Sequence, residues 1–207
     1  MSRLSDDASF DPATLAFYTK EAPDYVASGP GGVSRWLTSF LDHLPDGSRI
    51  LELGCGSGRD AEAMIAAGHD VDATDGTPAM AALASARLGY PVRVMRFDEL
   101  DVRDAYDAVW AHASLLHVPR LALPGILKRV FDALKPGGLH FATYKGGGTA
   151  GRDAAGRYFN YPDAGSLRAA YDAAAPWQID AIEDYVGGGY DGRQGPWLAI
   201  SARRPAD

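Results

Sequence analysis

Glycines at alternate positions, directly after a short apolar run, are the first residues in this chain whose spacing suggests chemistry. Residues 50–53 form the run, and Gly54, Gly56 and Gly58 follow it. Glycine has no Cβ, so such a turn can bend tightly and let a ligand approach the backbone. A glycine-rich turn is also often no more than a tight turn, and that interpretation stays open at this point.

A carboxylate about 20 residues further on adds a second signal, because Asp75 ends the next predicted strand, residues 71–75. In open α/β sheets ligands bind at the carboxyl ends of the strands, where a carboxylate can accept hydrogen bonds from ribose hydroxyls. The glycine turn and Asp75 together predict a nucleoside ligand. The dinucleotide fingerprint requires a third glycine where Arg59 stands, which argues against NAD and FAD.

Strands and helices are expected to alternate around these residues. Apolar runs predict strands over residues 50–53, 71–75, 92–97, 106–111 and 139–144. Apolar residues at helical spacing predict helices over residues 33–44, 61–65, 80–88 and 126–134. Gly68 is expected to be a left-handed cap, and Thr77 an N-cap before Pro78. This order predicts an α/β fold with a doubly wound, mainly parallel sheet that has helices on both faces.

The last third of the chain has a different pattern. A glycine-rich and alanine-rich stretch over 146–156 precedes three aromatic residues and a helix near 166–174, so residues 146–175 are expected to form a lid or connector. Strands over 177–182 and 197–202, on either side of a glycine-rich loop, predict a terminal antiparallel hairpin. One domain over residues 1–207 is expected, with helices in residues 1–45.

Composition narrows the function classes. A chain of 207 residues with 46% hydrophobic and 23% charged residues is ordinary globular material. Its net charge of -7 disfavours nucleic acid and anionic lipid as partners. No apolar run is long enough for a membrane span, and a single cysteine, Cys55, cannot form an internal disulfide, so a cytoplasmic protein is expected. Histidine, cysteine and aspartate do not cluster at metal-ligand spacing, so no metal is expected.

Two motifs carry a resemblance to a known family. The run LELGCGSG, residues 51–58, resembles the first motif of class I S-adenosylmethionine-dependent methyltransferases, and LKPGG, residues 134–138, resembles the turn before their fifth strand. The resemblance covers about residues 17–145, and it implies a Rossmann-like seven-stranded sheet and S-adenosyl-L-methionine as cofactor. The run WAHASLLHVP, residues 110–119, with GSGRDA before it, is most similar to small bacterial enzymes related to the tellurite-resistance methyltransferases.

The resemblance also implies roles for individual residues at the cofactor. The glycine turn passes beneath the methionine and ribose, Asp75 holds the ribose hydroxyls, and Gly76 and Met80 border the adenine. Asp98 is the candidate for the adenine amino group, with Glu99 and Asp101 in the same loop. Tyr18 and Tyr25 resemble aromatic residues that cover the methionine end, although plain core packing explains them nearly as well. The implied cofactor set is Tyr18, Tyr25, Gly54, Gly56, Gly58, Arg59, Asp75, Gly76, Met80 and Asp98.

The acceptor side is less defined by the sequence. An acceptor hydroxyl or protonated amine needs a base, and His112 is the candidate, followed by His117, although a lone histidine is more often a scaffold residue. Aromatic and basic residues in and before the lid are expected to bind the substrate, unless they form a hydrophobic clasp: Tyr144, Lys145, Tyr158 and Tyr161. Such a lid favours a small acceptor that is partly apolar or cationic.

Two other functions compete with methyl transfer. A catalytically inactive protein that only binds S-adenosylmethionine would need the same glycine turn and Asp75. A nicotinamide-dependent oxidoreductase is disfavoured, because it predicts a glycine at position 59 and a separate substrate region. The acceptor, the methylated atom and the oligomeric state are not specified by the residues.

Overall fold

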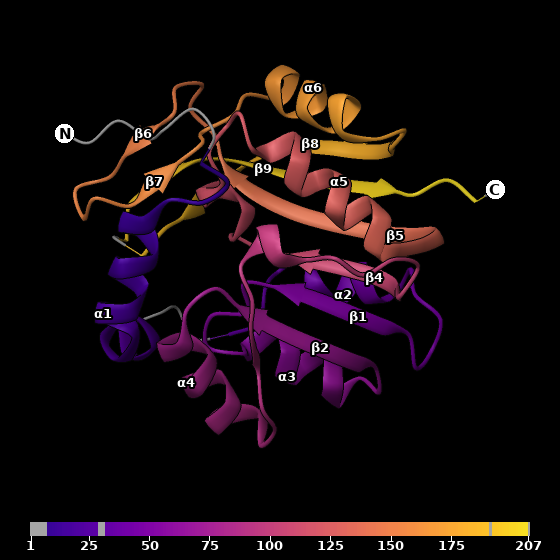
Figure 1. The fold of residues 1–207 in the computed structure, drawn as a ribbon, viewed down its shortest axis with the longest axis horizontal. Coiled ribbons are helices and arrows are strands. Elements are labelled where there is room, and N and C mark those ends of the chain that lie inside the picture. Colours follow the sequence, from indigo (N-terminus) through magenta and orange to yellow (C-terminus); the bar gives the residue numbers. More distant parts are fainter. Residues whose placement is uncertain (1–7, 29–31, 191, 207) are drawn as a thin grey trace.

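One seven-stranded sheet organises the protein, in a computed structural model that describes residues 8–28, 32–190 and 192–206. The strand order is β3-β2-β1-β4-β5-β9-β8 (Figure 1). Only β9 runs against its neighbours, β5 and β8. The predicted doubly wound, mainly parallel Rossmann-like sheet with a terminal antiparallel hairpin is confirmed. The strands are Arg49–Leu53 (β1), Asp70–Asp75 (β2), Arg93–Val94 (β3), Tyr106–Ala111 (β4), Leu134–Lys145 (β5), Gln178–Gly188 (β8) and Gln194–Arg203 (β9).

Six α-helices surround the sheet in the described part of the chain: Pro12–Ser28 (α1), Leu37–Leu41 (α2), Arg59–Ala66 (α3), Pro78–Leu88 (α4), Leu123–Ala133 (α5) and Ala164–Ala174 (α6). Thr77 is the N-cap of α4, with its side chain accepting from the Met80 amide, as predicted. Gly68 follows α3 with a φ of 91°, the left-handed conformation expected there. Among these helices, none has the length and apolarity needed to cross a bilayer.

Alternate residues of each strand face opposite helical layers, as the period of two in a strand requires. On one side Leu51 and Val109 pack in a cluster with residues of α5 and α6. On the other side Ile50, Ala108 and Trp110 pack with residues of α2, α3 and α4. The central strands β1 and β4 are therefore buried on both faces, so their residues can most readily meet a ligand near the strand ends.

A small hairpin of Gly151–Arg152 (β6) and Tyr158–Phe159 (β7) lies beside α1 at one end of the sheet (Figure 1). The Arg152 guanidinium donates to the buried Asp11 carboxylate at 2.6 Å. The Tyr158 amide donates to Thr14 Oγ1 at 2.9 Å. These contacts join the hairpin to α1, so the predicted lid or connector segment covers the same end of the sheet as α1.

Several predicted boundaries are wrong, each for a local reason. The third strand pairs only over Arg93–Val94, because the Arg96 amide donates to Glu99 Oε2 and starts a 3-10 turn, Phe97–Glu99 (η1). The helix predicted over residues 33–44 begins only at Leu37, because Asp60 accepts the Ser34 amide at 2.8 Å and holds that segment outside the helix.

Two further boundaries, at β5 and between β8 and β9, differ from the predicted ones. Helix α5 ends at Ala133, so Leu134 opens β5 instead of continuing the helix. The predicted loop over residues 187–195 is shorter, because β8 and β9 continue to pair as far as Gly188 and Gln194. Ile65, expected on the apolar side of α3, is 38% exposed.

Candidate cofactor and acceptor site

The turn between β1 and α3 depends on its three glycines. Gly54, Gly56 and Gly58 have φ values of 74°, 56° and 77°, which side chains strongly disfavour. A Cβ on Gly54 would lie 2.6 Å from Ser114 Cβ, so the turn also packs too closely for any side chain. Thr74 O accepts the amides of Gly54 and Cys55, at 2.9 and 2.8 Å, and ties the turn to β2.

Asp75 lies at the end of β2, directly beside this turn. Its Oδ2 accepts the Gly56 amide at 3.1 Å, and its Oδ1 accepts the Thr77 amide at 2.9 Å and the Thr77 hydroxyl at 3.1 Å. Burial raises the pKa of Asp75, and the bonds from Thr77 and Gly56 oppose that rise. The carboxylate is therefore held in one orientation, with one acceptor site, on Oδ2, left for a ligand.

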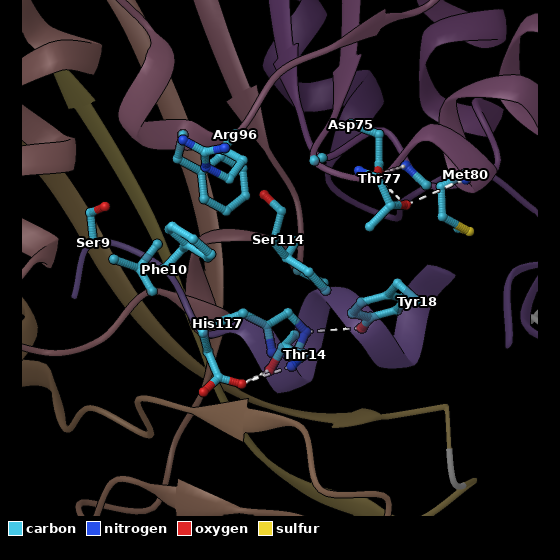
Figure 2. A pocket seen from close by; sticks show the side chains of 18 of the residues that line it. Ser9, Phe10, Thr14, Tyr18, Asp75, Thr77, Met80, Arg96, Ser114 and His117 are labelled. Carbon is cyan, nitrogen blue, oxygen red and sulfur yellow. Dashed lines mark hydrogen bonds between the residues drawn. The ribbon is translucent and has the colours of Figure 1, made fainter. Parts of the chain in front are cut away.

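Two cavities meet at the glycine turn. The smaller, of about 110 Å³, is lined by Asp75, Gly76, Met80, Arg96 and Phe97 among others. Figure 2 shows Asp75, Thr77 and Met80 on one side of it and Phe10 and Arg96 on the other. The larger has a volume of about 510 Å³. They form one continuous cleft because both are lined by Tyr18, Tyr25, Gly54, Gly56, Ala113 and His117.

A strained turn after β4 aims neighbouring side chains into different cavities. Ala113 has a φ of 53°, uncommon for a residue with a side chain, and its amide donates to Thr143 Oγ1 at 2.8 Å. His112 before it lines the larger cavity, and Ser114 after it lines the smaller. Backbone strain of this kind concentrates at functional sites.

Three buried polar atoms of residues that line the cleft have no hydrogen-bond partner within the described residues: Trp36 Nε1, Glu52 Oε2 and Ser114 Oγ. Buried polar groups without a partner are rare and call for an explanation such as an absent ligand. Burial raises the pKa of Glu52 well above its usual range, and the nearby Asp60 and Asp75 carboxylates raise it further. Glu52 is thus disposed to be neutral until a positively charged group approaches it.

His112 is placed as a side chain that can exchange a proton. Its Nδ1 lies 3.8 Å from Asp60 Oδ2, and its ring stacks on Trp110. Asp60 is itself fixed by the Trp110 indole, which donates to it at 3.0 Å. Burial lowers the pKa of His112, while Asp60 opposes that change, so the neutral ring is favoured and remains near a carboxylate that can stabilise its cation.

His117 is held in a different way. Its Nδ1 lies 2.6 Å from the Tyr158 carbonyl oxygen, which can only accept, so Nδ1 carries the proton. Its Nε2 then accepts from the Tyr18 hydroxyl at 2.9 Å. Burial lowers the pKa of His117 to about 4. Because both ring nitrogens are engaged, His117 joins α1 to the β6–β7 hairpin and is a poorer base than His112.

Most of the residues predicted for the site come together in this cleft: Tyr18, Tyr25, Gly54, Gly56, Arg59, Asp75, Gly76, Met80, His112 and Lys145. The others lie elsewhere. Gly58 packs against α4, and Asp98 accepts from Ser9 and Arg96 without lining either cavity. Tyr144 is fully buried in the core, and Tyr158 and Tyr161 line neither cavity.

Sequence reasoning gave no role to several residues of the cleft. A carboxylate in an otherwise apolar strand was a usable signal for Glu52, and Asp60 one residue after Arg59 was another. Arg157 gave no such signal, because its place beside Tyr18 depends on the fold of the hairpin. Within the described residues, no group of three or more histidine, cysteine, aspartate or glutamate side chains is arranged to hold a metal ion.

Comparison with known proteins bears on the fold and the class. Residues 50–138 match a family described as a methyltransferase domain. The cypemycin N-terminal methyltransferase of a Streptomyces species is 31% identical over 150 residues, which are 67% of this chain and 57% of that protein. The chain spans between 42% and 57% of the length of the curated relatives it matches.

Two solved structures share nearly the whole fold. One is the 1,6-didemethyltoxoflavin-N1-methyltransferase of Burkholderia thailandensis, with 1,6-didemethyltoxoflavin and S-adenosylhomocysteine bound. Its TM-score is 0.78 at 21% identity, and the aligned part covers 99% of this chain and 93% of that protein. The other is the [4+2]-cyclase SpnF, with a TM-score of 0.74 and 17% identity, covering 99% and 100%. The fold is thus the Rossmann-like fold of methyltransferases, and at these identities the likeness shows the fold alone.

Proposed function

We propose that the protein transfers a methyl group from S-adenosylmethionine to a small-molecule acceptor. The observation that carries the proposal is the buried Asp75 carboxylate, held in place by the glycine turn at the point where the two cavities meet. Its remaining acceptor site, on Oδ2, suits a ribose hydroxyl. The matching methyltransferase-domain family supports the same assignment.

The residues present fit the cofactor. Asp75 would hold the ribose, with Met80 and Phe97 against the adenine in the smaller cavity. Glu52, whose Oε2 has no partner in the described part of the chain, suits the methionine ammonium, and Arg59 suits its carboxylate. Tyr18 and Tyr25 stack edge to face with ring centroids 5.2 Å apart and cover the junction between the cavities.

The chain's own contribution to transfer is positioning, exclusion of water and removal of a proton. S-adenosylmethionine, when bound, supplies a methyl group on a sulfonium sulfur, which an acceptor can displace in line. The aromatic residues around the larger cavity exclude water and orient the acceptor. The Nε2 of His112 would take the proton of a hydroxyl or amine acceptor, with Asp60 stabilising the ring once it is charged.

A small molecule suits the larger cavity better than a polymer, because about 510 Å³ lies within the usual range for a small-molecule pocket. The bound 1,6-didemethyltoxoflavin in the Burkholderia thailandensis structure is an acceptor of that size class. We further infer one methyltransferase domain over the chain, with α1 and the 146–175 segment covering the cleft. The narrower resemblance to tellurite-resistance-related enzymes stays a prediction.

Binding and turnover together test the proposal. Calorimetric titration is expected to show micromolar binding of S-adenosylmethionine and S-adenosylhomocysteine and none of NAD. A screen of small phenols, amines and aromatic acids, read by S-adenosylhomocysteine release, is then expected to give turnover. Binding of both sulfur compounds without turnover on any acceptor would favour the binding-only protein. Binding of NAD, or of none of the three, would contradict the methyltransferase assignment.

A further inference from the structure

The larger cavity carries a charge opposite to that of the chain as a whole. The protein has a net charge of -7, yet the basic side chains at this cavity outnumber the acidic ones, Glu52 and Asp60. The basic side chains are Arg35, Arg59, Lys145 and Arg157. Arg157 is balanced by Asp153, which accepts from it at 2.7 and 2.9 Å, and Arg59 is assigned above to the methionine carboxylate.

Lys145 is the cation best placed to meet an acceptor. It ends β5, opposite Trp197 of β9, and its side chain is half-buried. Its Nζ lies 4.6 Å from the centroid of the Phe159 ring and 5.8 Å from that of Trp197. The Lys145 charge also contributes to the lowered pKa of His117, which lines both cavities. The ammonium therefore lies at the larger cavity, beside the Phe159 and Trp197 rings.

Aromatic faces surround that ammonium. Phe159, Tyr185, Tyr190 and Trp197 all line the larger cavity, and Tyr185 stacks on Trp197. Flat rings of this kind favour a flat ligand, because stacking places π-systems 4.5–7 Å apart over a large contact area. A cation held over aromatic rings keeps its charge and pairs with an anion in a partly desolvated site.

We propose that the acceptor is a planar aromatic acid whose anionic group pairs with Lys145 while its ring stacks among Phe159 and Trp197. The inference rests on the proposed function, which it deepens by naming the acceptor class. It agrees with the partly apolar acceptor, and differs from the cationic one, that the aromatic lid suggested from sequence, because the sequence did not show that Lys145 and Arg35 line the same cavity as those rings.

Binding of matched probes tests the inference without turnover. The protein is saturated with S-adenosylhomocysteine and titrated calorimetrically with 2-naphthoate, 2-naphthamide and 2-(aminomethyl)naphthalene, which differ mainly in charge. A second pair, 4-hydroxybenzoate and 4-hydroxybenzamide, repeats the comparison with a smaller ring. In each pair the acid is expected to bind about tenfold more tightly than the amide, as one charge-assisted hydrogen bond predicts.

Variants assign the preference to Lys145. Lys145→Met is expected to reduce the acid preference to twofold or less, and Lys145→Arg to retain most of it. Lys128→Met is the matched control, because Lys128 pairs with Asp132 on α5 and does not line either cavity. Thermal melting of each variant checks that it is folded.

The outcomes separate the inference from the proposed function. Equal binding of acid and amide, a preference for the amine, no binding of either acid, or an acid preference unchanged in Lys145→Met would overturn the inference while leaving S-adenosylhomocysteine binding intact. Failure of S-adenosylhomocysteine to bind in the first titration would contradict the proposed function itself, whatever the aromatic probes do.

Discussion

Replacing Asp75 by alanine is expected to weaken cofactor binding more than any other single change in β2. In the protein, Oδ1 accepts two hydrogen bonds from Thr77 and Oδ2 accepts one from Gly56. One acceptor site is therefore left on Oδ2, to which a ribose hydroxyl can donate. Asp75→Ala removes this bond to the ligand and leaves the hydroxyl facing a void.

The size of the effect follows from that one bond. A hydrogen bond to a charged group contributes about 1.5–3 kcal/mol, and part of the loss is recovered by water that enters the void. The net loss is therefore about 1.5–2 kcal/mol, which corresponds to a dissociation constant roughly 10- to 30-fold higher. Asp75→Asn keeps the shape of the side chain and is expected to lie between the wild type and the alanine variant.

Calorimetric titration with S-adenosylhomocysteine measures this difference directly. Asp70→Ala is the matched control, because Asp70 opens the same strand, its side chain is 70% exposed, and it pairs only with Arg49 at 3.5 Å among the salt bridges of the described residues. A dissociation constant that changes by less than threefold in Asp75→Ala, with the same thermal melting behaviour as Asp70→Ala, would refute the assigned ribose contact.

Three further predictions concern the turn, the base and the buried histidines. Gly54→Ala is expected to lower the free energy of unfolding, measured in urea, by about 2–4 kcal/mol, because the new Cβ would lie 2.6 Å from Ser114 Cβ. Gly47→Ala is the control, with a similar φ of 70° and open space around the position, and is expected to lower it by about 1 kcal/mol. Equal losses in the two variants would contradict the packing argument. On an acceptor with an ionisable hydroxyl, His112→Asn is expected to lower kcat by roughly 10²- to 10⁴-fold and to leave S-adenosylhomocysteine binding within about twofold; an unchanged kcat would remove His112 from the mechanism. Burial lowers the pKa of His117 and of His140 to about 4, so between pH 6.5 and pH 4 the unfolded chain binds more protons at these two sites than the native protein does. These sites therefore lose their stabilising contribution as the pH falls through that window, while the raised pKa values of Glu52 and Asp75 act in the opposite direction. NMR titration of the two rings is expected to show both neutral at pH 5.5, and protonation of both at that pH would mean that they are solvated in the native protein.

The sheet and its glycine turn were predictable because local signals agree with the global fold there. The runs in β1, β4 and the second half of β5 are largely apolar over the length of a buried strand, and Thr77 with Pro78 marks the start of α4. Each of these features depends on residues near one another in sequence. For this reason the sequence pattern was sufficient to predict a doubly wound sheet.

The acceptor side was harder to predict because its contacts join distant segments. Tyr144 follows the alternation of β5 into the core, while its neighbour Lys145 faces the cavity, and the sequence does not show which of the two does so. Asp98 is engaged by Ser9, 89 residues earlier. His112 follows β4 and Asp60 lies in α3, so only the folded chain shows that the histidine has a carboxylate beside it.

A crystal structure of the protein with S-adenosylhomocysteine is the most direct test of the assigned cofactor site. A ribose hydroxyl is expected within hydrogen-bond distance of Asp75 Oδ2, with the adenine against Met80 and Phe97 in the smaller cavity and the sulfur facing the cavity that His112 and Lys145 line. An adenine bound in the larger cavity, or a ligand that does not touch Asp75, would contradict the proposed site.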